Sequence, residues 1–170
     1  MSSTQKNIEQ VVDLILEDYA GGRDIDKLEN DRQPDKDIII DVIEKLRRIM
    51  FPGYFRDKTY RIYNAKHNLS MLIEDVMYNL SRQISLVFRD EGRTEEDARE
   101  VCLQFLSRIP AIRDMVQTDL QAAYDGDPAA SGKEEIVYSY PGLFAITVYR
   151  LAHVLQVLGV PMIPRIMTEY

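Results

Sequence analysis

The stretch LSMLIEDVMYNLSRQISLVF, residues 69–88, decides the fold class of this chain. Its apolar residues recur every three or four positions, which is the repeat of one face of an α-helix. They are Leu69, Leu72, Ile73, Val76, Met77, Leu80, Ile84, Val87 and Phe88. The stripe predicts a long amphipathic helix, covered either by the rest of the chain or by another subunit, because both kinds of burial use the same residues.

Similar helical patterns lie on both sides of this stretch. Thr94 and Asp97 fit the acidic form of a capping box, and Pro110 breaks or restarts the chain between two patterns. Only the short stretch 135–138 has a pattern that a strand could share. The sequence therefore predicts an all-α multi-helix bundle. Further helices are predicted over residues 4–20, 35–51, 94–109 and 141–158, with a short one from 164. Another is predicted from Ile112 into the turn-forming segment 124–132, where it ends.

The composition is that of an ordinary globular protein, with 170 residues, 45% hydrophobic and 29% charged. A net charge of −7 argues against nucleic acid or an anionic membrane as a partner, because both require clustered Lys and Arg. The longest apolar stretch, 143–163, is interrupted by polar residues and by Pro161, which favours a buried helix over a membrane span. Cys102 is the single cysteine, and residues 1–10 show no basic-then-apolar leader, so we expect a cytoplasmic protein.

Three features in the last third of the chain are similar to the serine O-acetyltransferase family. The segment VQTDLQAAY, 116–124, runs into DGDPAA, 125–130, and the family carries a similar Asp-Ile/Leu-Gln helix followed by Asp-Pro-Ala. The segment YPGLFAITVYRLAH, 140–153, resembles the family's Gly-Phe/aromatic-x-Ala-x-x-x-Tyr-Arg-x-x-His helix. A closing helix over 163–170 resembles the one that precedes the family's hexapeptide repeats. The resemblance covers about residues 103–170, and the first hundred only by helical character and length.

This resemblance implies the amino-terminal helical domain of an enzyme that transfers acetyl from acetyl-CoA to L-serine in cysteine biosynthesis. We expect the domain to span residues 1–170, subdivided into a variable helical head, 1–65, and a family-like part, 66–170. The family's left-handed parallel β-helix, which is implied to carry the catalytic His, its carboxylate partner and the acetyl-CoA groove, has no counterpart here. We therefore expect no catalytic or cofactor-binding residue in this chain, and no activity from the chain alone.

The resemblance also implies partners. The family forms dimers of trimers through the helical domain, so part of the apolar surface of the 69–88 helix is expected at a homo-oligomer interface. L-serine is the implied substrate. A cysteine synthase is the implied partner of the full-length enzyme, through its far carboxyl tail.

Asp127 is the candidate substrate-binding residue. By resemblance, the Asp ahead of Pro-Ala binds the ammonium group of serine, a role suited to a carboxylate in a partly shielded cleft. The residues themselves also support a structural alternative, since Asp125, Gly126 and Pro128 are all turn formers and would end a helix here. The two interpretations are compatible.

The remaining candidates have structural explanations. His153 lies on an apolar helix without a nucleophile or carboxylate at triad-like spacing, which predicts a packed core histidine, whereas His67 is expected to be exposed. Cys102 is predicted to lie in the core. Two distant His and one Cys predict no metal site. The alternative function is a non-catalytic helical oligomerisation or adaptor module; a complete small enzyme is the weakest hypothesis because no catalytic group of residues can be assembled.

Overall fold

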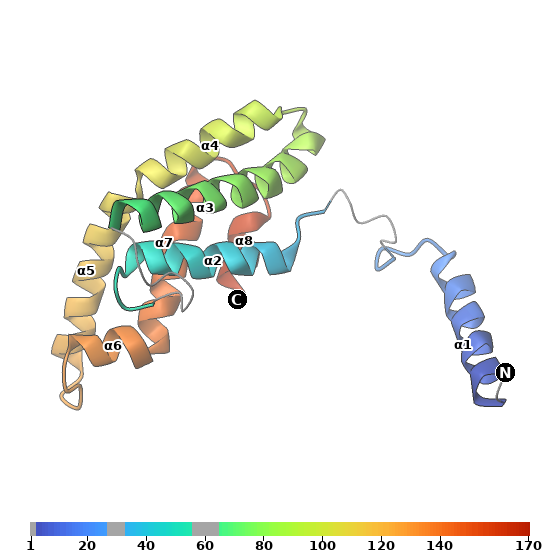
Figure 1. The fold of residues 1–170 in the computed structure, drawn as a ribbon, viewed down its shortest axis with the longest axis horizontal. Coiled ribbons are helices and arrows are strands. Elements are labelled where there is room, and N and C mark those ends of the chain that lie inside the picture. Colours follow the sequence, from blue (N-terminus) through green and yellow to red (C-terminus); the bar gives the residue numbers. More distant parts are fainter. Residues whose placement is uncertain (1–2, 27–32, 56–64) are drawn as a thin grey trace. The chain divides into compact units, whose positions relative to one another are not determined.

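A computed structural model describes residues 3–26, 33–55 and 65–170 (Figure 1). Within these ranges the chain has helices and no strand, as predicted. It divides into two compact units, Met1–Gln33 and Pro34–Tyr170. The elements are α1 (Ser3–Tyr19), α2 (Lys36–Met50), α3 (Ala65–Phe88), the 3₁₀ helix η1 (Arg89–Glu91), α4 (Glu95–Ser107), α5 (Ile109–Gly126), α6 (Lys133–Ser139), α7 (Pro141–Val157) and α8 (Ile163–Thr168).

The first unit contains the amphipathic helix α1. Its apolar side chains are exposed, including Ile8, Val11 and Leu14. The helix is followed by Gly22 with a φ of 64°, a left-handed conformation that glycine adopts without steric cost. A glycine in the left-handed conformation therefore follows the end of this helix.

The second unit is a helical bundle in which α3 packs against both α2 and α4, and α7 packs against both α5 and α8. Figure 1 shows α3 and α4 side by side as a helical hairpin joined through η1. Phe88 and Phe105 are fully buried and belong to the apolar core cluster. The other large side chains with less than 2% exposure are Ile39, Ile43, Leu46, Leu80, Ile84, Ile112, Ile136, Leu151, Leu155 and Ile163.

The apolar stripe of residues 69–88 is core over most of its length. Val76, Leu80 and Ile84 are buried within the unit. At the start of α3, however, Leu69 of the stripe is 47% exposed, and Met71, which lies beside the stripe, is 37% exposed. Intramolecular packing therefore accounts for the later turns of the stripe and leaves its first turns available to another surface.

The ends of the helices follow the predicted capping chemistry. The Thr94 hydroxyl accepts from the Asp97 N–H at 3.1 Å, and the Asp97 carboxylate accepts from the Thr94 N–H at 2.7 Å, so the predicted capping box is present. Asp35 caps α2 through its side chain, and its own N–H donates to the buried Gln83 at 2.7 Å. Pro110 lies in the first turn of α5, where its missing N–H costs no intrahelical bond.

Two boundaries differ from the sequence prediction. Residues 135–138 form part of the helix α6 instead of a strand, because the adjacent Ile136 and Val137 are both buried, which the alternating faces of a strand would not allow. The helix predicted from Ile112 begins three residues earlier, at Ile109, and ends at Gly126, within the predicted turn-forming segment. The proposed subdivision at residues 65 and 66 stays a prediction.

The helix α8 is held by contacts with α2 and α7. This helix packs against α2, and the Tyr170 hydroxyl donates to the Glu44 carboxylate at 3.4 Å. The Phe144 ring contacts Tyr170 edge-on, with ring centroids 6.3 Å apart. Across the described ranges, every helix is too short or too polar to span a bilayer.

Candidate functional site

Asp127 follows the last residue of α5, in the connection to α6 at one end of the second unit (Figure 1). Its carboxylate Oδ1 accepts from the Ala129 N–H at 2.9 Å, and its carbonyl accepts from the Ala130 N–H at 3.1 Å. These contacts form the predicted turn after the helix. The turn holds Asp127 at a partly buried position.

Tyr140, at the junction of α6 and α7, contacts the same carboxylate. Its hydroxyl donates to Asp127 Oδ2 at 2.6 Å. This bond, together with the Ala129 N–H, lowers the pKa of Asp127 below its ordinary value, because both donors stabilise the carboxylate anion. The same bond raises the pKa of Tyr140 to about 12. At neutral pH the pair is therefore a fixed carboxylate and a neutral hydroxyl donor.

A second carboxylate, Glu135, is held in the first turn of α6. The Ser131 hydroxyl and N–H donate to Glu135 Oε2 at 2.5 and 2.8 Å. These bonds lower the pKa of Glu135, although the charge of Asp127 acts in the opposite direction. The end of the unit around the α5–α6 connection therefore carries two ionised carboxylates.

An ion pair joins the two helices on which the family resemblance rests. The Arg150 guanidinium of α7 donates through Nε and Nη2 to both oxygens of Asp119 of α5, each at 2.6 Å. This contact raises the pKa of Arg150. A bidentate pair fixes both distance and orientation, so it holds α5 and α7 in register on either side of the Asp127 connection.

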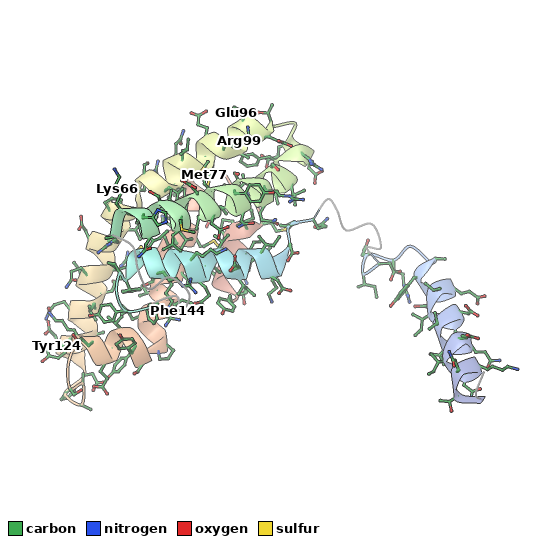
Figure 2. The ribbon with its side chains drawn as sticks, viewed as in Figure 1. Lys66, Met77, Glu96, Arg99, Tyr124 and Phe144 are labelled. Carbon is green, nitrogen blue, oxygen red and sulfur yellow. The ribbon has the colours of Figure 1, made fainter. Side chains whose placement is uncertain are left out.

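Gln121 and Lys133 brace the same connection from within. The Gln121 amide donates to Asp125 at 2.8 Å and accepts from the Lys133 ammonium. The Lys133 ammonium also lies 5.7 Å from the centroid of the Tyr124 ring. Figure 2 shows Tyr124 on the part of α5 that leads into this connection. Lys133 thus has partners on α5.

The other residues considered from the sequence lie elsewhere. The prediction that His153 is a core residue is wrong, because this side chain is exposed and stacks on Tyr149 with ring planes 13° apart. The buried face of α7 is formed by residues such as Leu151 and Leu155, and His153 lies on the opposite side. His67 is exposed, as predicted. Cys102 is fully buried, also as predicted, and burial raises the pKa of its thiol to about 12.

A cleft of ≈ 1580 Å³ opens between α2, the first turns of α3 and the start of α5. Its apolar wall includes Ile49, Leu69 and Leu72, and Lys45 and Arg113 lie among its lining residues. None of its lining residues belongs to the Asp127 connection. Among the residues that the structure describes, no three His, Cys, Asp or Glu side chains come together as a metal-binding group.

Tyr140, Glu135 and Ser131 were not among the residues singled out from the sequence. Tyr140 stood only at the start of the 140–153 motif, and no spacing rule connects it with a carboxylate 13 positions earlier. Ser131 and Glu135 are four residues apart and Gly132 is the N-cap residue of α6, so the three-residue spacing of a capping box did not mark them.

The chain resembles serine acetyltransferases in sequence. No protein-family model matches it. The plasmid-encoded serine acetyltransferase of Synechococcus elongatus is 32% identical over 139 residues, covering 75% of this chain and 44% of that protein. The serine acetyltransferase of a Synechocystis species is 40% identical over 51 residues, covering 30% of this chain and 20% of that protein. The chain thus spans less than half the length of these curated relatives.

Solved structures give the same result. Serine acetyltransferase 1 of Entamoeba histolytica, in a crystal structure with L-cysteine, has a TM-score of 0.63 at 31% identity over 81% of this chain and 46% of that one. Isoform 3 from the same organism, also solved with cysteine, has a TM-score of 0.63 at 29% identity over 75% of this chain and 44% of that one. The chain is therefore homologous to serine acetyltransferases and corresponds to their all-helical amino-terminal part.

Proposed function

We propose that this chain is the amino-terminal helical domain of a serine O-acetyltransferase, and that it supplies one wall of the L-serine site. In this proposal Asp127 binds the ammonium group of serine. The observation that supports this role most directly is the state of the Asp127 carboxylate, which is ionised at neutral pH and oriented by one donor on each oxygen. An ammonium group is the cationic part of serine that such a carboxylate would bind.

The relatives support an amino-acid ligand. L-cysteine, present in the crystal structure of the Entamoeba histolytica relative, carries the same α-ammonium and α-carboxylate as L-serine. In the proposed enzyme, acetyl-CoA is the co-substrate and the acetyl transfer is performed by groups outside this chain. We assign to residues 1–170 the binding and positioning of serine, without a catalytic residue, a bound cofactor or a metal. A cysteine synthase partner of the full-length enzyme stays a prediction.

A second role of the domain is homo-oligomerisation, with a dimer of trimers as the expected assembly. The first turns of α3 support this role, because Leu69 and Met71 expose apolar surface there. The test is light scattering on the wild-type chain and on the double variant Leu69→Glu/Met71→Glu. We expect the double variant to have a lower mass, whereas Ser70→Glu on the same exposed turn should not change it. An unchanged mass in the double variant would exclude this surface from the assembly.

The enzymatic proposal is tested by acetyl-CoA-dependent acetylation of L-serine. The assay compares this chain with the product of its complete reading frame. We expect activity from the longer product alone. Activity from neither would favour the helical oligomerisation or adaptor module, and activity from the short chain would show that catalytic groups lie within residues 1–170.

The role of Asp127 is tested in the active form of the protein. Asp127→Asn keeps the shape of the side chain and its contact with Ala129 but removes its charge. We expect the KM for L-serine to rise by about tenfold or more, since a charge-assisted contact is lost. Asp125→Asn is the matched control, because Asp125 lies two residues away and pairs with Gln121. Equal KM values in the two variants would exclude Asp127 from the serine site.

A further inference from the structure

The plane of the Asp127 carboxylate is fixed by two donors from different segments. Ala129, in the turn, donates to Oδ1, and Tyr140, thirteen residues along the chain, donates to Oδ2. Without such donors a carboxylate can rotate about its Cβ–Cγ bond. The turn contact alone holds one oxygen, and the Tyr140 hydroxyl is what fixes the second.

The position of Tyr140 is itself set by the backbone. Tyr140 has extended dihedral angles, φ −88° and ψ 112°, between two helices. The following residue, Pro141, disfavours a helical conformation for the residue before it, so the break between α6 and α7 is built into the sequence. The Tyr140 N–H also donates to the Ile136 carbonyl at 3.0 Å. The backbone that carries the Tyr140 side chain therefore has a fixed conformation between α6 and α7.

The remaining hydrogen-bonding capacity of the pair consists of acceptors. A carboxylate offers about four lone-pair positions, of which the two donors occupy two. A tyrosine hydroxyl has one hydrogen, and that hydrogen is used on Asp127, so only its lone pairs remain. An ammonium group has three donors and no acceptor, and it matches such a site. A carboxylate or carbonyl oxygen would meet only other acceptors.

The charged side chains near this pair also favour a cationic ligand. Glu135 is a second anion at this end of the unit and lies close enough to raise the pKa of Tyr140 together with Asp127. Lys133, by contrast, has its ammonium against Gln121. Two anionic side chains, Asp127 and Glu135, therefore act on the Tyr140 hydroxyl, and their charges favour a cationic group beside it.

From this geometry we propose that Tyr140 is a positioning and specificity-determining residue of the serine site: it orients the Asp127 carboxylate and makes the pair selective for a protonated amine. The inference rests on the proposed role of Asp127 in binding serine. It goes beyond that role because it assigns a second residue, from a different helix junction, to the selection of an amino group.

The test uses steady-state kinetics of the product of the complete reading frame. We expect Tyr140→Phe to raise the KM for L-serine by about 3- to 10-fold, the usual effect of losing one hydrogen bond to a charged group. The kcat and the KM for acetyl-CoA should stay within about twofold, because the hydroxyl acts on amine binding alone. Tyr138→Phe is the matched control, since it removes the same hydroxyl from an exposed tyrosine two residues away.

A double-mutant cycle distinguishes positioning from a general structural role. In an Asp127→Ala background, Tyr140→Phe should have no further effect on the KM for L-serine, because the hydroxyl has lost its partner. If Asp127→Ala itself leaves this KM unchanged, the proposed serine contact fails and the inference fails with it. If Asp127→Ala raises the KM and Tyr140→Phe does not, only the inference is overturned. Additive effects of the two substitutions on the KM for L-serine would also overturn the inference. So would an equal rise in the KM values for L-serine and acetyl-CoA in Tyr140→Phe.

A spectroscopic measurement tests the coupling without catalysis and without a Tyr140 variant. In this chain, the pKa of Tyr140 is followed by NMR of tyrosine labelled at the ring carbon that carries the hydroxyl. Asp127→Asn should lower the pKa of Tyr140 from about 12 toward its ordinary value of 10.0. An unchanged pKa would show that the hydroxyl does not act on Asp127, and would overturn the inference even if the enzyme assays gave no activity.

Discussion

Removal of the ion pair between Arg150 and Asp119 is expected to destabilise the second unit by about 2 kcal/mol. Both N–H···O contacts are 2.6 Å, and the two side chains are 26% and 20% exposed. Exposed pairs contribute about 0.2–1 kcal/mol, whereas breaking a buried pair costs about 3–5 kcal/mol. Because the Arg150–Asp119 pair is partly exposed, its contribution is expected to lie between these two ranges. For a unit of this size, 2 kcal/mol corresponds to a fall in Tm of about 7 °C.

The assay is urea unfolding followed by circular dichroism, on the wild type, Asp119→Ala, Arg150→Ala and the double variant. We expect each single variant to lose most of this unfolding free energy of about 2 kcal/mol. The coupling energy obtained from the four proteins should be at least about 1 kcal/mol. Arg165→Ala is the control, because its pair with Glu169 is 80% and 61% exposed and should contribute less than about 0.5 kcal/mol. Additive single effects would refute the reasoning that this contact holds α5 and α7 together.

Three further predictions concern the helical bundle. Phe105→Ala should lower the free energy of unfolding by about 3–5 kcal/mol in urea titrations, whereas truncation of the exposed Leu103 to Ala should change it by less than about 0.5 kcal/mol; similar losses would contradict the assignment of the core. Cys102 should react with a thiol reagent at pH 8 only in denaturant, because burial raises its pKa to about 12; rapid labelling of the folded chain would contradict this. Thr94→Ala should cost about 1 kcal/mol at pH 7 through the lost N-cap. The Thr94 N–H and hydroxyl both lower the pKa of Asp97, and the variant loses only the hydroxyl bond; the stabilisation from that bond is present above the unfolded pKa of 3.8 and is lost as the pH falls through the folded value. The difference between variant and wild type should therefore shrink in melts below about pH 4, and a constant difference would count against the capping box.

The sequence predicted the helices that have a long apolar face and an identifiable cap. The stripe ending at Phe88 and the Thr94 cap are examples, because a period of 3.6 residues and a local side-chain bond are both local properties. The short helix α6 could not be separated from a strand, since seven residues hold fewer than two full repeats. His153 was misplaced because an apolar helix still has an outer face, and only packing decides which residues lie on it.

The candidate site shows the same limit. Asp127 could be selected from the sequence because the Asp-Pro-Ala motif marks it and because its turn chemistry is local. Its contact with Tyr140 depends on how α6 returns the chain toward the end of α5, and no periodicity contains that information. The pairing of Asp119 with Arg150 likewise joins two motifs that the sequence presents only in order.

The packing of α8 on α2 has a consequence for biosynthesis. The α3–α4 hairpin joins neighbouring segments and can form as soon as both have left the ribosome. By contrast, the contact between Tyr170 and Glu44 closes a loop across 126 positions, so α2 obtains its full set of neighbours only when α8 has been made. Part of the apolar face of α2 therefore stays uncovered until α8 has been made, and during that interval the nascent chain presents it to chaperones.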